Sequence, residues 1–120
     1  MNIYAENVMD YYKHPRNKGI IEDATNSLEE NNPLCGDKIR ISLKIDDGKI
    51  MSARFDGQGC AISQASASML MEKIEGMLVT ELLKLDKEYI IEMLGIPITG
   101  TRLKCAMLGL RIAQKAVTKS

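Results

Sequence analysis

The sequence predicts an α+β fold, a small three-stranded antiparallel sheet with helices packed on one face. Three observations support this prediction. The chain opens with an amphipathic pattern, continues with strict alternation of apolar and polar residues from Lys38, and ends in helical patterns. An order of helix, strands and then helices is typical of helices that cover one face of an antiparallel sheet.

Length and composition set limits on this fold. The 120 residues fit one domain, 1–120, and 45% of them are hydrophobic, which is enough for a modest core. Sixteen basic residues balance sixteen acidic ones, so no global charge favours nucleic acid or an acidic membrane. The segment 93–120 carries five basic residues and no acid, so this end is locally positive.

The sequence shows no membrane or export signal. No apolar run approaches the roughly 18–20 residues of a membrane span, and the first residues lack the basic and apolar regions of a signal peptide. Three cysteines, an odd number, fit free thiols in a reducing compartment better than a disulfide framework. We therefore expect a soluble cytoplasmic protein with neither membrane nor nucleic acid as a partner.

The first predicted elements are a helix and an edge strand. The helix covers Ile3–Lys13 and ends before His14-Pro15, because the residue before a proline avoids helical geometry. The only histidine, His14, is expected to be structural or at the surface rather than a ligand. A short edge strand is expected near Asp23–Glu29.

A β-hairpin follows, and its register can be tested on the sequence. Strands run over 38–45 and 51–56, joined at Asp46-Asp47-Gly48. A two-residue turn at Asp47-Gly48 would set Leu43 opposite Ser52 and mix apolar with polar residues on one face. A three-residue loop instead pairs Ile39 with Phe55, Ile41 with Ala53 and Leu43 with Met51.

We therefore predict the second register. Extended toward the open end of the hairpin, it sets Asp37 opposite Gly57 and Cys35 opposite Gly59, so that Cys35 and Cys60 meet.

Helices are expected in the second half of the chain. One covers 61–74, and a weaker stretch covers 80–83. Another helix covers 86–94, with Asp86 as its N-cap, and ends at Gly95. Thr101 is expected to cap a last helix that ends near Thr118. Its apolar stripe is Leu103, Met107, Leu110, Ala113 and Val117.

The three cysteines carry the most informative chemistry. Cys35 lies in a turn-rich loop, Cys60 opens one predicted helix, and Cys105 is expected in the first turn of another. The positive end of a helix favours thiolate, which is both the nucleophile and the metal ligand. Asp37 adds an oxygen donor, so the four residues could hold zinc or an iron–sulfur unit.

Spacing alone leaves an alternative open. The sequence has no CxxC pair, and separations of 25 and 45 residues match no local zinc-finger rule, so three unrelated cysteines are the competing interpretation.

Longer motifs identify a family. The segments NPLCGD, GQGCAISQASASML and RLKCAML resemble the three cysteine motifs of the IscU, SufU and NifU N-terminal iron–sulfur scaffold proteins. The opening YxxHPRNKG pattern and the spacing also match, and the resemblance covers nearly the whole chain.

This resemblance implies a scaffold rather than an enzyme. Such proteins receive sulfur from a pyridoxal-phosphate cysteine desulfurase and iron from another source, assemble a labile [2Fe–2S] cluster, and pass it to apo-proteins. The ligands carry over to Cys35, Asp37, Cys60 and Cys105. Members often hold zinc when isolated, and a homodimer around the cluster is expected as one state.

Two departures separate this chain from the IscU branch. That branch has histidine immediately before its third cysteine, whereas this chain has Lys104, which cannot ligate when protonated but could pair with Asp37 or screen an anionic cluster. The Leu-Pro-Pro-Val-Lys segment read by a specialised Hsp70-type chaperone is replaced by Ile98-Thr99-Gly100-Thr101-Arg102, which argues against that release route.

Lys104 also keeps two other hypotheses open. SufU-type members carry a basic residue at this position, although they usually have an insertion for which this chain leaves little room. The protein could therefore be a zinc-dependent sulfur acceptor, with Cys35 as the expected persulfide site. A purely structural zinc module is the third hypothesis.

Overall fold

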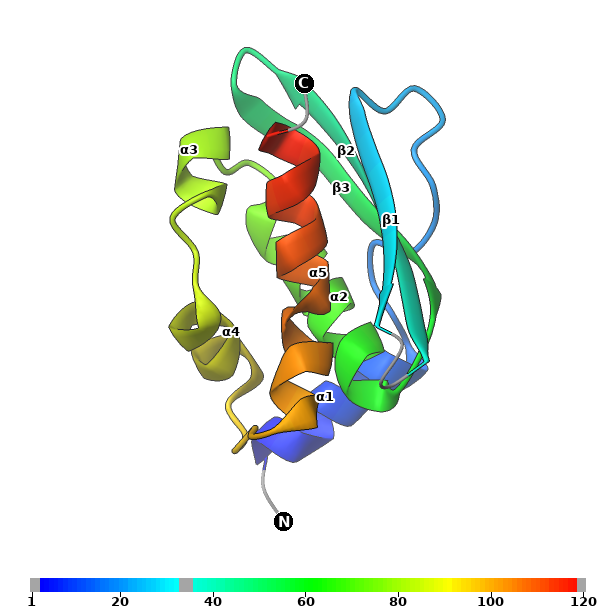
Figure 1. Ribbon diagram of the computed structural model, residues 1–120, viewed down its shortest axis with the longest axis vertical. Helices are drawn as coiled ribbons and strands as arrows, with labels where there is room; N and C mark the ends of the chain where they lie inside the picture. The colour runs from blue at the N-terminus through cyan, green and yellow to red at the C-terminus, as the bar shows by residue number, and fades with distance from the viewer. Residues whose placement is uncertain (1–2, 33–35, 119–120) are drawn as a thin grey trace.

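The fold follows the predicted order of elements. The computed structural model describes residues 3–32 and 36–118. The elements are α1 (Ile3–Lys13), β1 (Asn26–Asn32), β2 (Asp37–Asp46), β3 (Lys49–Gln58), α2 (Ala61–Ile74), α3 (Val79–Leu82), α4 (Lys87–Leu94) and α5 (Thr101–Thr118). The strands form one antiparallel sheet in the order β1-β2-β3, with α2 and α5 packed on one face (Figure 1). The predicted α+β class is confirmed.

The predicted hairpin register is wrong by two residues. Ile41 pairs with Phe55 and Leu43 with Ala53, while the turn is the two-residue Asp47-Gly48 turn that we rejected. Both turn residues have positive φ, 51° and 74°, as a type I′ hairpin turn requires.

A β-bulge reconciles this turn with an apolar face. Lys44 pairs with Ser52 but Ile45 pairs with Ile50, so Met51 is an extra residue on β3. Ile50 is fully buried, whereas Met51, predicted to lie on the buried face, is 54% exposed. The bulge therefore changes which residues face the core, and no alternation rule anticipates it.

Most helix boundaries agree with the sequence. Both α1 and α2 have the predicted limits, and the Asp86 carboxylate caps α4 by accepting a hydrogen bond from the Tyr89 N–H (3.2 Å). Gly95 ends α4 with a left-handed φ of 70°. The edge strand begins at Asn26, three residues later than predicted. Thr101 is the first residue of α5 rather than its cap.

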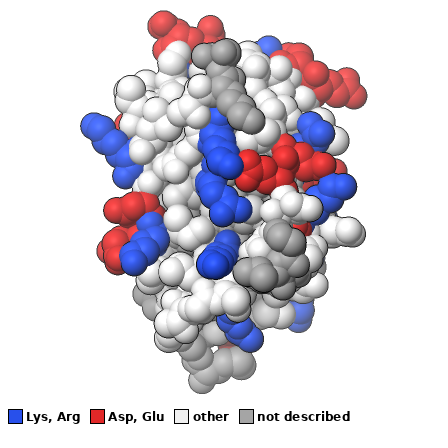
Figure 2. All heavy atoms as spheres, viewed as in Figure 1, with Lys and Arg blue, Asp and Glu red and all other residues white. Residues whose placement is uncertain are grey.

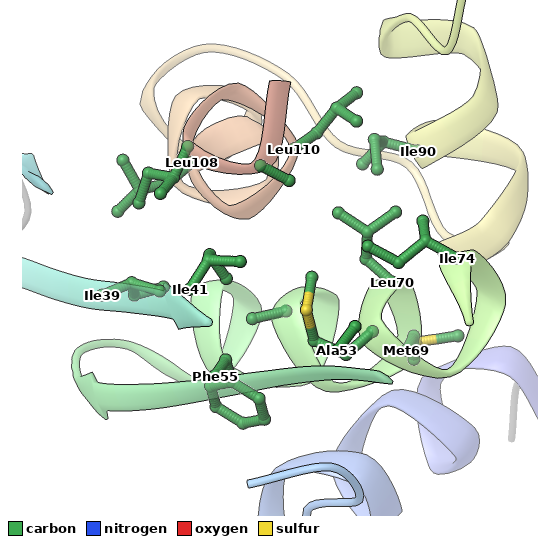
Figure 3. Packing of buried hydrophobic residues seen from close by; sticks show 14 of the residues in the cluster. Ile39, Ile41, Ala53, Phe55, Met69, Leu70, Ile74, Ile90, Leu108 and Leu110 are labelled. Carbon is green, nitrogen blue, oxygen red and sulfur yellow. The ribbon is translucent and has the colours of Figure 1, made fainter. Parts of the chain in front are cut away.

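The core fills the space between the sheet and the helices. Ile39 and Ile41 of β2 face Leu70 of α2 and Leu108 of α5, and all four are essentially inaccessible to solvent (Figure 3). Burying each such side chain stabilises the fold by about 1.5–3 kcal/mol. The buried face of α5 is rotated around the helix from the predicted stripe. Leu108, Ile112 and Ala116 are buried, whereas Leu103, Met107 and Val117 of the predicted stripe are only partly buried.

Polar contacts fasten α1 to α2. The Tyr11 hydroxyl donates a hydrogen bond to the Glu72 carboxylate, and the Arg16 guanidinium lies 4.1 Å from the Tyr11 ring centroid. Ser68 exchanges hydrogen bonds with the Arg16 backbone, accepting from its N–H (2.7 Å) and donating to its carbonyl (2.8 Å). These contacts fix α1 and the segment that follows it beside the C-terminal half of α2. Within residues 3–32 and 36–118, the structure has no helix that is both long and apolar enough to cross a membrane.

Candidate metal centre

Asp37 is buried at the start of β2. Its side chain is 0% exposed, and its Oδ1 accepts a hydrogen bond from the Cys60 backbone N–H at 2.8 Å. Its Oδ2 is also buried and has no hydrogen-bond partner within the part of the chain that the structure describes. A buried carboxylate oxygen without a partner is costly, so Oδ2 is well suited to accept a metal ion.

Cys60 lies between β3 and α2 and is the N-cap of that helix. Its backbone is extended, with φ −72° and ψ 167°, and its Sγ accepts a hydrogen bond from the Ser63 N–H at 3.5 Å. The Ser63 hydroxyl donates to the Cys60 carbonyl at 3.0 Å, which braces the same turn. The Cys60 side chain is exposed, so its sulfur is accessible at the positive end of α2.

Cys105 completes the described part of the group from α5. It is the fifth residue of that helix, one residue deeper than predicted, because α5 begins at Thr101. Only 3% of Cys105 is exposed. One ligand atom from each of Asp37, Cys60 and Cys105 lies within 4.8 Å of the others. Two sulfurs and a carboxylate oxygen at this spacing match the donor set of zinc or of an iron–sulfur unit.

An open hollow of about 370 Å³ gives access to the two cysteines. It is formed by α1 and by the first turns of α2 and α5, with Met9, Cys60, Ala61, Ile62, Thr101, Arg102 and Cys105 as its lining. The centre is therefore a surface site rather than an enclosed structural one.

The remaining predicted residues have different outcomes. Cys35 lies outside the described residues, so its meeting with Cys60 stays a prediction. Asp37 does not oppose Gly57, which pairs with Ile39. Lys104 is exposed, and its side chain makes no ion pair with Asp37 among the residues described. The role of Lys104 in screening a bound anion stays a prediction. His14 is exposed, as expected.

Gly59 is a site residue that the sequence analysis named only as the expected cross-strand partner of Cys35. A Cβ at this position would lie 2.3 Å from Asp37 Oδ1 and 2.7 Å from Ser63 Oγ. Glycine therefore allows the carboxylate to approach the backbone at Cys60. The glycine immediately before a helix-opening cysteine was the available signal, but only the structure shows which side chain fills the space.

The family comparison agrees with this geometry. A family model described as the NifU-like N terminal domain matches residues 3–120. The chain belongs to this family. The resemblance of the cysteine motifs is thereby confirmed.

Relatives within the family carry two kinds of name. The zinc-dependent sulfurtransferase SufU of Bacillus subtilis is 37% identical over 98% of this chain and 90% of the relative. The iron–sulfur cluster assembly scaffold protein IscU of Thermotoga maritima is 43% identical over 72% of this chain and 61% of the relative. The alignment with the Bacillus protein spans 134 positions, so that relative has residues that this chain lacks.

A solved structure shows the same fold. A Fervidobacterium islandicum protein described as an iron–sulfur cluster assembly scaffold for the SUF system superposes with a TM-score of 0.81 and 31% identity. The superposition covers 93% of this chain and 94% of that one.

Proposed function

We propose that this protein is a scaffold that assembles a transient [2Fe–2S] cluster and passes it to apo-proteins. Sulfur comes from a pyridoxal-phosphate cysteine desulfurase, and iron is the second substrate. The observation that supports this most directly is the convergence of Asp37, Cys60 and Cys105 within 4.8 Å beside an open hollow. Cys35 is the proposed fourth ligand on the strength of its motif. On this proposal the protein is a carrier rather than an enzyme.

The mixed ligand set suits a cluster that must leave. A carboxylate is a harder and weaker partner for iron than a fourth thiolate. Cys60 is exposed while Cys105 is buried, so one edge of the bound cluster would face solvent and an incoming acceptor. A homodimer around the cluster is one arrangement that this exposed edge allows.

A second candidate function is zinc-dependent sulfur transfer. It is favoured by the match to the Bacillus sulfurtransferase over 98% of this chain and by Lys104 before the third cysteine. Asp37, Cys60 and Cys105 would hold the zinc ion, which would keep the cysteine sulfurs deprotonated and fixed in position when bound. Cys35 would be the thiol that accepts persulfide sulfur.

Anaerobic reconstitution distinguishes the two functions. The apo-protein is incubated with ferrous iron, cysteine and a cysteine desulfurase, repurified, and examined by visible absorption. We expect [2Fe–2S] bands that disappear in Cys35→Ser, Cys60→Ser and Cys105→Ser. Asp37→Asn tests the carboxylate in the same assay. Its matched control is Asp46→Asn, because Asp46 is an exposed carboxylate at the other end of β2.

Each alternative has its own result. A colourless protein that retains one zinc ion and accelerates the desulfurase would support sulfur transfer. Full cluster retention by Cys105→Ser would contradict the ligand assignment for both functions.

A further inference from the structure

The mouth of the metal centre is positive. The first turns of α2 and α5 both border the hollow, and each helix directs its positive end there. Among the described residues that line the hollow, Arg102 is the one charged side chain. Basic side chains follow the course of α5 in Figure 2, with acidic residues of the neighbouring strand beside part of them.

Arg102 differs from the basic residues further along α5. Arg111 Nε lies 3.8 Å from Glu30 Oε1, and Lys115 Nζ lies 2.9 Å from Glu30 Oε2. Within residues 3–32 and 36–118, no carboxylate lies within ion-pair distance of Arg102. Its charge therefore remains available at the edge of the hollow.

A loaded centre is an anion. A zinc ion or a [2Fe–2S] core carrying two positive charges, held by the thiolates of Cys60 and Cys105 and the carboxylate of Asp37, keeps one net negative charge. The thiolate of Cys35 would add another. A negative centre that is partly removed from water needs a positive neighbour.

We propose that Arg102 is the counter-ion of the loaded centre and retains the anionic cargo electrostatically. This inference rests on the proposed function, since it assigns a residue to the same site. A guanidinium suits the role because it stays charged at all relevant pH values and is more weakly hydrated than an ammonium group. An exposed side chain can also move aside when an acceptor approaches.

Metal affinity tests the role without any cluster chemistry. Co²⁺ binding to the apo-protein is followed by its visible bands, and Zn²⁺ affinity is measured by competition with a chromophoric chelator. In 0.1 M salt, Arg102→Ala should weaken binding by about 1.5-fold to fivefold, the range of exposed ion pairs. In 1 M salt, where the Debye length is about 3 Å, the difference should disappear.

Two further variants sharpen the test. Arg102→Lys keeps the charge and should restore most of the affinity. Arg111→Ala removes an equal charge from the same helix about 13 Å further along, beyond a Debye length of about 10 Å at 0.1 M salt, and should leave affinity unchanged. Circular dichroism checks that each variant is folded.

The outcomes separate this inference from the proposed function. Wild-type affinity in Arg102→Ala, equal losses in Arg102→Ala and Arg111→Ala, or a loss that persists in 1 M salt would overturn the role of Arg102 alone. Equal metal binding by the wild type and by a Cys60→Ser, Cys105→Ser double variant would overturn the proposed centre and the counter-ion with it.

Discussion

Replacing Gly59 by alanine should disrupt the metal centre without replacing any of the proposed ligand residues. The new Cβ would lie 2.3 Å from Asp37 Oδ1, so the carboxylate must move by about 1 Å to reach ordinary contact. Gly59 is not among the glycines with positive φ, so its backbone accepts alanine and the effect is steric. The displaced Oδ1 would lose its 2.8 Å hydrogen bond from the Cys60 N–H.

The expected cost follows from that hydrogen bond. A hydrogen bond to a charged group contributes about 1.5–3 kcal/mol, and overpacking adds a cost of about 1–3 kcal/mol that partly overlaps with it. We expect Gly59→Ala to lower the free energy of unfolding by about 2–4 kcal/mol, measured by urea denaturation of the apo-protein. Co²⁺ affinity should fall about tenfold or more, because the displaced carboxylate no longer presents its oxygen at the same distance from the two cysteine sulfurs.

Gly109→Ala is the matched control. There the added Cβ would lie 3.5 Å from Ala67 Cα, an ordinary contact, and alanine favours a helix interior by up to about 1 kcal/mol. This variant should be neutral or slightly stabilising and should bind Co²⁺ normally. Wild-type stability and affinity in Gly59→Ala would refute the close approach, whereas lost stability with normal affinity would refute Asp37 as a ligand.

Three further predictions concern Asp37, Tyr11 and Gly57. Asp37→Asn keeps an acceptor for the Cys60 N–H and removes a buried charge, so the apo-protein should retain its stability while its Co²⁺ affinity falls. Asp37→Ala should lower both the stability of the apo-protein and its Co²⁺ affinity. Equal urea midpoints for the two variants would contradict the role of the hydrogen bond. The hydrogen bond to Glu72 raises the pKa of Tyr11, so its stabilisation is present below pH about 10 and is lost as pH rises through the folded-state pKa. Tyr11→Phe should therefore be less stable by about 0.5–1.5 kcal/mol at pH 7, with a difference that shrinks above pH 10 in thermal melts. Gly57→Ala would place a Cβ 1.9 Å from the Lys38 carbonyl oxygen of β2, at a backbone φ of +139°. It should lower the free energy of unfolding by more than about 4 kcal/mol. A wild-type melting temperature for this variant would argue against the observed strand register.

The local sequence was sufficient to predict features that depend on one helix and the residues next to it. The limits of α1 and α2, the Asp86 cap and the stop at Gly95 all follow from capping groups and backbone preferences within a few residues. The family assignment likewise rests on contiguous motifs around the cysteines, and the family model confirms it.

The hairpin shows where local rules conflict. The Asp47-Gly48 turn and the apolar alternation each predicted a different register, and the sequence provided no way to satisfy both. Packing in the core resolves the conflict. The free energy gained by burying Ile50 outweighs the loss of regular strand pairing at the bulge at Met51.

The sequence by itself determined the order of elements, the fold class and the residue types that could bind a metal, because each depends on short-range pattern and chemistry. Only the tertiary structure decided how those residues meet. Asp37, Cys60 and Cys105 come from a strand, a helix cap and a distant helix, and their approach depends on the sheet register and on the packing of α5. The absence of a Cβ at Gly59 allows the carboxylate to reach the Cys60 N–H, a contact between residues 23 positions apart that no spacing rule predicts.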